Sequence, residues 1–182
     1  MRFGGVGACM GATASRQGIA SLVERHYESL YRYAYRLSGA STDAEDLTQE
    51  AFCKAQAQMG QLRDPERAKP WLFAILRNAY LHRARSDRAH RQVSLDAVGD
   101  LPDDPPEVPE IGSDQLQQAL NELPEGFRTP VILFYFEDMS YRDIAEQMDL
   151  PIGTVMSRLA RAKTHLRARL LPAAPSTGVP GR

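Results

Sequence analysis

The chain has few of the residues that build metal centres, disulfide frameworks and membrane spans. Its 182 residues include two cysteines, Cys9 and Cys53, and four scattered histidines, none at a spacing typical of metal ligands. No apolar run approaches the ~20 residues that a membrane-spanning helix needs. Residues 1–14 also lack the apolar core of a secretory signal. We therefore expect free thiols, no metal or cofactor, no membrane insertion and a location in the cytoplasm.

Charge of one sign is missing from two long segments, although the net charge of the chain is only -1. Residues 94–114 hold seven acids and no lysine or arginine. Residues 152–171 hold five lysines and arginines and no acid, and residues 77–91 hold five arginines against one aspartate. Basic patches on helices are typical of proteins that bind nucleic acid. The sequence thus predicts two basic surfaces separated by an acidic linker.

The apolar pattern predicts an all-α protein. Apolar residues recur at the helical spacing of three and four in both halves of the chain, and no alternation of strands and helices is present. Residues 131–136 (VILFYF) have the composition of a strand, but a lone strand would have no partner, so we interpret them as a buried helix. We expect two small helical domains joined by a flexible linker: a disordered extension (1–14), an N-terminal domain (15–92), the linker (93–112), a C-terminal domain (113–171) and a disordered tail (172–182).

Four local signals place the ends of the expected helices. Thr42 and Glu45 form a capping-box pattern, which predicts a helix N-terminus at this point. Pro70 is favourable in the first turn of a third helix. Ser113 and Ser140 are the expected N-caps of two helices in the second half.

The last helix, from residue 152 to 171, has the side-chain distribution of a DNA-reading helix. On a helical wheel its core face is Ile152, Val155, Leu159, Ala162, Leu166 and Leu170. The opposite face is Gly153, Ser157, Ala160, Arg161, Thr164 and Ala168, flanked by cations on both sides. Small residues can approach base edges while the flanking cations meet phosphates. With the short helix and turn before it, this segment predicts a helix-turn-helix; a solvated basic helix packed on its neighbours is the alternative.

Three blocks of sequence closely resemble extracytoplasmic-function (group IV) sigma factors of the sigma-70 family. LPEGFRTPVILFYFEDMSYRDIAEQMDLPIGTVMSRLARAKTHLRARL resembles region 4, DAEDLTQEAF (Asp43 to Phe52) resembles region 2.2, and KPWLFAILRNAYLHRAR (Lys69 to Arg85) resembles regions 2.3 and 2.4. The resemblance covers residues 15–171. It implies a non-enzymatic protein that binds core RNA polymerase through the β′ clamp helices and the β flap, binds the -35 and -10 elements of promoter DNA, and is bound by an anti-sigma factor.

The resemblance also implies roles for residues of the last helix. Ser157 and Arg161 would contact bases of the -35 element, and Thr154, Arg158 and Lys163 would lie near phosphates. Two positions depart from the family pattern. Met156 stands where lysine or arginine is frequent, so one contact is expected to be absent. Asp149 stands where glycine is usual in the turn, and aspartate tolerates the left-handed conformation that this turn needs.

In the N-terminal half the resemblance implies two interfaces. The polymerase-binding residues would be Asp46, Gln49 and Glu50, for which a solvated acidic face is the alternative. The -10 DNA-binding residues would be Arg77, Asn78, Tyr80, Arg83 and Arg85. His82 stands where the family has aspartate, which leaves the -10 preference open. The loop over residues 60–67 resembles the segment that captures a flipped base, and we expect Trp71 to be in the core rather than stacked on that base.

Two other functions are compatible with parts of the pattern. A stand-alone helix-turn-helix regulator would need no polymerase, but it would have no use for the acidic face of the second helix. A nuclease could use the acids between Asp43 and Glu50 as metal ligands, but no second cluster of His or carboxylate residues supports it.

The acidic linker would either mimic RNA in the polymerase channel or act as a solvated tether.

Overall fold

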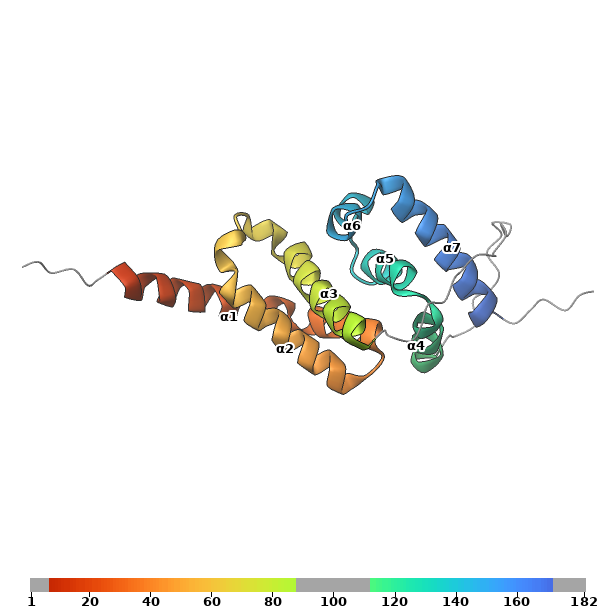
Figure 1. Ribbon diagram of the computed structural model, residues 1–182, viewed down its shortest axis with the longest axis horizontal. Helices are drawn as coiled ribbons and strands as arrows, with labels where there is room; N and C mark the ends of the chain where they lie inside the picture. The colour runs from red at the N-terminus through yellow and green to blue at the C-terminus, as the bar shows by residue number, and fades with distance from the viewer. Residues whose placement is uncertain (1–6, 88–111, 172–182) are drawn as a thin grey trace, which may run out of the picture.

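The computed structural model describes residues 7–87 and 112–171, and it describes side chains from residue 18 to 84 and from 112 to 171. Every regular element in these ranges is helical, which confirms the all-α class (Figure 1). The elements are α1 (Gly7–Ser38), α2 (Ser41–Ala57), the short 3-10 helices η1 (Met59–Gln61) and η2 (Pro65–Arg67), α3 (Ala68–Asp87), α4 (Ser113–Glu122), α5 (Glu125–Tyr135), α6 (Tyr141–Met148) and α7 (Ile152–Leu170). Apart from Gly112, the predicted linker and tail lie outside the described residues.

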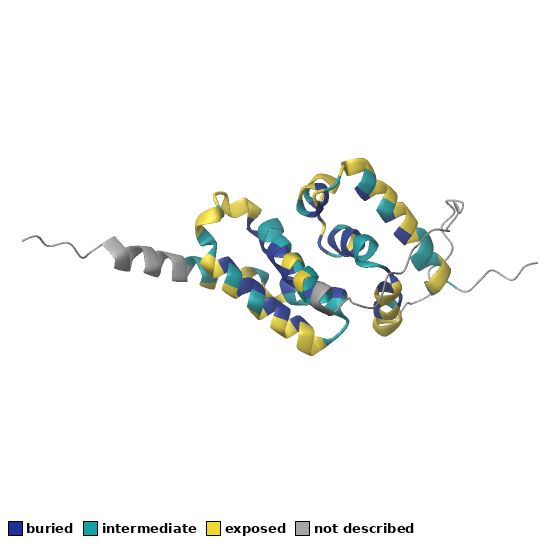
Figure 2. Cartoon of the chain, in the orientation of Figure 1, coloured by how far each residue is buried: buried dark blue, intermediate teal, exposed yellow. Residues whose placement is uncertain are grey.

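Helices α1, α2 and α3 form the N-terminal unit around a shared apolar core. Leu30, Leu47 and Leu76, one from each helix, are almost completely buried. The rings of Tyr33 and Phe73 stack across the α1–α3 contact with their centroids 4.8 Å apart. Burial of aliphatic and aromatic side chains of this size supplies most of the stability of a small helical unit. Figure 2 shows the buried positions along the facing sides of these helices.

Helices α4 to α7 form the C-terminal unit, with the buried helix α5 at its centre. The VILFYF segment is helical, as predicted; α5 ends at Tyr135, with Phe136 as its C-cap residue. Ser140 caps α6 by accepting a hydrogen bond from the Asp143 N–H at 3.1 Å, as predicted. Asp149 then adopts a left-handed conformation (φ 54°), which confirms that aspartate can make the turn between α6 and α7.

Two predicted helix starts, those of α2 and α4, are wrong by one or two residues, whereas the start near Pro70 is confirmed. The N-cap of α2 is Ala40, without a side-chain cap, and Thr42 is inside the helix because Gly39, at φ 80°, turns the chain early. The N-cap of α4 is Gly112, so Ser113 is the first helical residue. Helix α3 starts two residues before Pro70, which still lies in the first turn, where its missing N–H costs nothing. Helix α1 starts at Gly7, so residues 7–14 are helical, in keeping with their alanines.

The two units pack directly against each other. Helix α1 contacts α4 and α5, and α3 contacts α6. Arg128 Nη1 donates to the Leu37 carbonyl at 2.6 Å, which closes the C-terminal end of α1 with a side chain from the other unit. The guanidinium of Arg36 lies over the Phe136 ring, 3.9 Å from its centroid. The N- and C-terminal units are therefore joined by polar and aromatic contacts as well as by the linker.

Candidate nucleic-acid and protein interfaces

The acidic face of α2 points away from the core of the N-terminal unit. Asp46 and Gln49 are exposed, whereas Glu50 is partly buried beside two cations. Lys54 Nζ lies 2.6 Å from one oxygen of Glu50, and Arg83 donates to the other from Nη2 at 2.7 Å and from Nε at 3.0 Å. The hydrogen bonds from Lys54 and Arg83 lower the pKa of Glu50, against an opposing effect of burial. Asp46 and Gln49 are thus the accessible part of this face.

The predicted -10 residues of α3 adjoin this acidic face. Arg83 makes the bond to Glu50, and its Nη1 lies 4.0 Å from an Asp46 carboxylate oxygen. Asn78 is exposed and Tyr80 is half-buried. The side chain of Arg85 lies outside the described side chains. The structure therefore brings the predicted polymerase face and the predicted -10 helix together, although Glu50 and Arg83 are 33 residues apart.

Arg77, the first of the predicted -10 residues, forms an ion pair with Glu125 of the C-terminal unit. Its Nε donates to Glu125 Oε1 at 3.0 Å, and the two side chains are only 13% and 12% exposed. The Thr129 hydroxyl donates to the same oxygen at 2.9 Å. In this arrangement Arg77 does not face solvent. Sequence reasoning missed the contact because its partners lie 48 residues apart, in separate domains.

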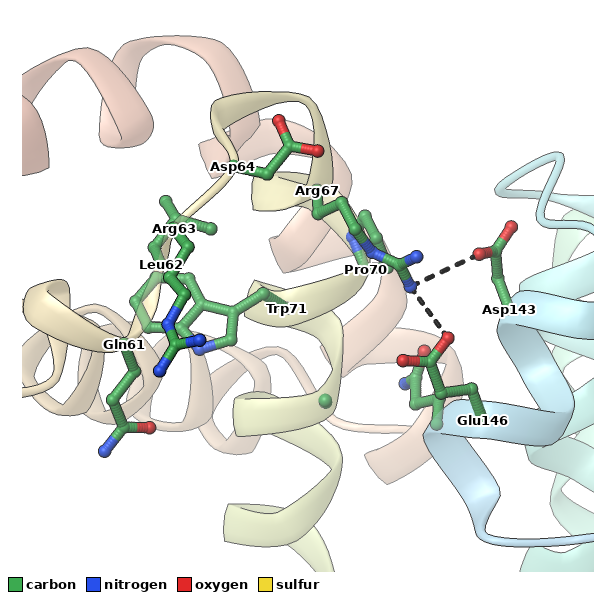
Figure 3. Close-up of a pocket in the computed structure, with 11 residues that line it drawn as sticks. Gln61, Leu62, Arg63, Asp64, Arg67, Pro70, Trp71, Asp143 and Glu146 are labelled. Carbon is green, nitrogen blue, oxygen red and sulfur yellow. Dashed lines mark hydrogen bonds and ion pairs between the residues drawn. The ribbon is translucent and has the colours of Figure 1, made fainter.

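A second group of contacts lies where the loop over residues 60–67 faces α6. Arg67 Nη2 lies 2.9 Å from Glu146 Oε2 and 3.6 Å from Asp143 Oδ1, as Figure 3 shows. A cavity of about 390 Å³ opens beside this cluster, and the half-buried Trp71 lines it together with residues of α6. The segment that resembles a flipped-base pocket is therefore partly covered by the C-terminal unit.

Lys69 is a third cation of the N-terminal unit that pairs with an acid of the C-terminal unit. Its Nζ lies 3.2 Å from Glu137 Oε2 and also donates to the Glu137 carbonyl at 2.8 Å. Glu137 is 4% exposed, and burial raises its pKa although Lys69 opposes the rise. Three cations of the N-terminal unit, on η2 and α3, thus meet acids of α5, of α6 and of the segment between them.

The outward face of α7 carries the predicted -35 residues. Ser157 and Arg161 are exposed, and the Ser157 hydroxyl donates to the Thr154 carbonyl at 3.0 Å. Lys163 is also exposed, while Thr154 is half-buried. The core side of the helix is held by Val155, Leu159 and Ala162, which are nearly completely buried. This packing leaves Ser157 and Arg161 pointing away from the protein, as a base-reading role requires.

Arg158, predicted to lie near a phosphate, is directed back into the protein. Its Nη1 donates to the Gly126 carbonyl at 3.2 Å, and its guanidinium lies over Phe127, 6.0 Å from the ring centroid. The reason lies in α5. Pro130 has no N–H, so it cannot donate to the carbonyl four residues earlier, which is that of Gly126. Arg158 satisfies this carbonyl and thereby fixes α7 against α5.

The prediction that Ile152 belongs to the core of α7 is wrong. Its side chain is 47% exposed, because the first helical residue lies beyond the part of α7 that packs on α5 and α6. Met156, one turn later, is 52% exposed. Leu166 and Leu170, at the other end of the predicted core face, are partly buried. The N-terminal end of α7 therefore presents two large apolar side chains to solvent.

Within the side chains that the structure describes, no three His, Cys, Asp or Glu residues are grouped so that they could hold a metal ion. None of the described helices combines the length and apolarity needed to cross a membrane. Cys53 is a free, exposed thiol.

The sequence matches two family models in order. Sigma-70 region 2 matches residues 22–90, and Sigma-70, region 4 matches residues 113–166. ECF RNA polymerase sigma factor SigE of Mycolicibacterium smegmatis is 38% identical over an alignment of 152 residues, and the match covers 80% of this chain and 59% of that protein. ECF RNA polymerase sigma factor SigL of Mycobacterium tuberculosis is 33% identical over an alignment of 165 residues, and the match covers 88% of this chain and 93% of that protein.

Solved structures show the same arrangement of helices. The sigma factor RpoE of Bartonella quintana, crystallised with the anti-sigma factor NepR, is 28% identical, with a TM-score of 0.65 over 87% of this chain and 98% of that chain. CnrH, in complex with the cytosolic domain of CnrY, has a TM-score of 0.62 at 24% identity, which supports the fold alone. The chain belongs to the extracytoplasmic-function sigma factors of the sigma-70 family.

Proposed function

We propose that this protein binds core RNA polymerase and directs promoter-specific initiation of transcription. The observation that carries the proposal is the combination, in one chain, of both sigma-70 regions with an exposed recognition helix. A sigma factor contributes no catalytic group of its own, so we propose a non-enzymatic role in the cytoplasm. A helix-turn-helix alone would also suit a stand-alone regulator, but the acidic face of α2 favours a protein partner.

The exposed residues of α7 are the proposed -35 readers. Ser157 and Arg161 would reach base edges from the N-terminal half of the helix, and Lys163 would lie near phosphate. Thr154 is a further candidate near phosphate. Arg158 would act indirectly, since its bonds to α5 orient the recognition helix. Its truncation would therefore weaken DNA binding through the position of α7.

The proposed polymerase surface is the acidic face of α2. Asp46 and Gln49 are accessible, and Glu50 would be released for a partner only by giving up its bonds to Lys54 and Arg83. On α3, Asn78 and Tyr80 are the accessible -10 candidates. Arg83, together with Arg85, would complete that set.

Contact with both promoter elements would require the two units to separate. We call the arrangement in the structure, with the two units in contact, the closed form. In it Arg77 pairs with Glu125, and α6 covers part of the loop near Arg67. We propose that core polymerase holds the units apart, frees Arg77 for the -10 strand and keeps the linker acids away from DNA. The isolated protein would then bind promoter duplex weakly at physiological salt.

An anti-sigma factor is the second proposed partner. RpoE of Bartonella quintana was crystallised with the anti-sigma factor NepR, and this chain covers 98% of that sigma factor chain. In this chain the N- and C-terminal units pack against each other, so an anti-sigma factor could bind a surface to which both units contribute. The proposal is that such a partner stabilises the closed form.

In vitro transcription with purified core polymerase tests the proposed function. We expect the protein to give discrete start sites downstream of a shared pair of promoter elements on a genomic template library. Arg161→Ala should alter which templates are used, whereas Gln118→Ala, at an exposed position of α4, should not. No start site above that of core enzyme alone would contradict the proposal.

A further inference from the structure

An exposed apolar pair marks the start of the recognition helix. Ile152 and Met156 are one turn apart, so they lie next to each other on α7, and their side chains are 47% and 52% exposed. Both positions belong to the described part of the chain, and about half of each side chain faces solvent there. Two adjacent apolar side chains on a basic helix with no acid suit a partner that is anionic and also presents an apolar group, as DNA does.

We propose that Met156 reads the 5-methyl group of a thymine in the -35 element, with Ile152 as its apolar neighbour. The inference rests on the proposed function and extends it to sequence preference. The major groove exposes a single apolar group on the bases, the thymine methyl, and apolar side chains recognise it by contact. Phosphates at the groove edges would meet the cations of α7.

The position of Met156 suits this contact. It precedes the exposed Ser157 and lies one turn before the exposed Ala160, whose small side chain leaves room for a base edge. The N-terminal part of a recognition helix is the part that contacts bases in a helix-turn-helix. The methionine side chain is long and unbranched, so from the edge of the DNA-facing surface it can reach a thymine methyl group and pack against it.

Packing within the protein does not account for the pair. The core side of α7 is already filled by Val155 and Leu159. Ile152 borders a shallow surface depression with Asp149, whose carboxylate would disfavour a phosphate at that point. Met156 lies one turn further from the Asp149 carboxylate, so DNA can approach Met156 more closely than Ile152. We therefore assign the contact with the thymine methyl group to Met156.

The test uses holoenzyme assembled from this protein and core polymerase. A promoter with six randomised base pairs in the -35 element is selected by binding, and each thymine of the selected element is then replaced in turn by uracil, which lacks only the methyl group. We expect one position at which uracil weakens binding about four-fold, the effect of exposing one methyl group. Met156→Ala should abolish that difference and preserve preference at other positions.

Met156→Lys gives a second, independent readout. Lysine favours guanine, so the selected base at the same position should change from thymine to guanine. Gln118→Ala, at an exposed position of α4 outside the proposed DNA surface, serves as the control. Equal binding of thymine and uracil at every position, or a difference that persists in Met156→Ala, would overturn the inference. So would a loss of polymerase capture in Met156→Lys with unchanged base preference, which would assign the pair to a protein interface.

The outcome is separable from that of the proposed function. A selection that yields no preferred sequence at all contradicts the proposed -35 role. A clear preference without methyl dependence contradicts only the role of Met156.

Discussion

Replacing Glu125 by glutamine should open the contact between the two units. Among the described residues, the Arg77–Glu125 pair is the most enclosed ion pair between the units, with side chains 13% and 12% exposed and a distance of 3.0 Å. Glutamine keeps the shape and still accepts the hydrogen bond from Thr129, so the change removes the charge and little else. In the closed form Arg77 is then left buried without a counter-charge.

The expected size follows from this burial. Removing one partner of a fully buried pair costs about 3–5 kcal/mol, chiefly because the other charge is left unpaired. Arg77 retains some exposure, so we expect about 2 kcal/mol, which corresponds to a shift of about thirty-fold towards the open form. The penalty falls on the closed form alone, because water solvates Arg77 once the units separate.

Fluorescence energy transfer between the units measures this shift. One dye is placed on the native, exposed Cys53 of α2 and the other on Ala168→Cys of α7, in a Cys9→Ser background. Glu125→Gln should lower the transfer efficiency, while circular dichroism shows unchanged helix content. Glu45→Gln, which neutralises an exposed acid of α2, is the matched control and should leave the transfer as in the wild type. Unchanged transfer in Glu125→Gln would refute the electrostatic account of the closed form.

Three further changes test the interfaces. Arg161→Ala should cost about 1–3 kcal/mol on the preferred promoter and relax preference at one or two -35 positions, measured by competition binding; an equal loss on all sequences would assign it to phosphate. Asp46→Lys should weaken capture of core polymerase with normal helicity, and adding Glu50→Lys should weaken it further; undiminished capture would remove this face from the interface. The pKa of Glu50 is lowered in the fold, so its contribution to stability is present above the unfolded value of 4.5 and lost as pH falls through the lowered value. The difference in melting temperature between wild type and Glu50→Gln should therefore shrink in acid, and a constant difference would contradict the pairing.

The features that the sequence predicts well are those set by neighbours along the chain. Helical spacing of apolar residues predicted the all-α class, and the turn at Asp149 followed from the tolerance of aspartate for positive φ. The N-cap of α2 was misplaced because Gly39 turns the chain before the apparent capping box begins. Local preference cannot reveal which of two nearby starts allows better packing of α2 on α1.

The features that it predicts poorly depend on contacts between distant segments. Arg158 has the spacing of a phosphate-binding residue, but Pro130 frees a carbonyl that only the folded chain brings within its reach. Arg77 has the context of a -10 residue, yet its partner Glu125 belongs to the other domain. Both arginines are cations on basic helices, and nothing in their local sequence distinguishes them from Arg161, which remains exposed.

Binding of promoter duplex with and without core polymerase tests the central claim most directly. The measurement is a mobility shift at fixed, physiological salt on a duplex that carries both selected elements, with a scrambled duplex of equal length as the control. We predict weak binding that does not distinguish the two duplexes for the isolated protein, and tight binding to the promoter alone once core polymerase is added. Tight, sequence-specific binding by the isolated protein would contradict the account and favour a stand-alone regulator.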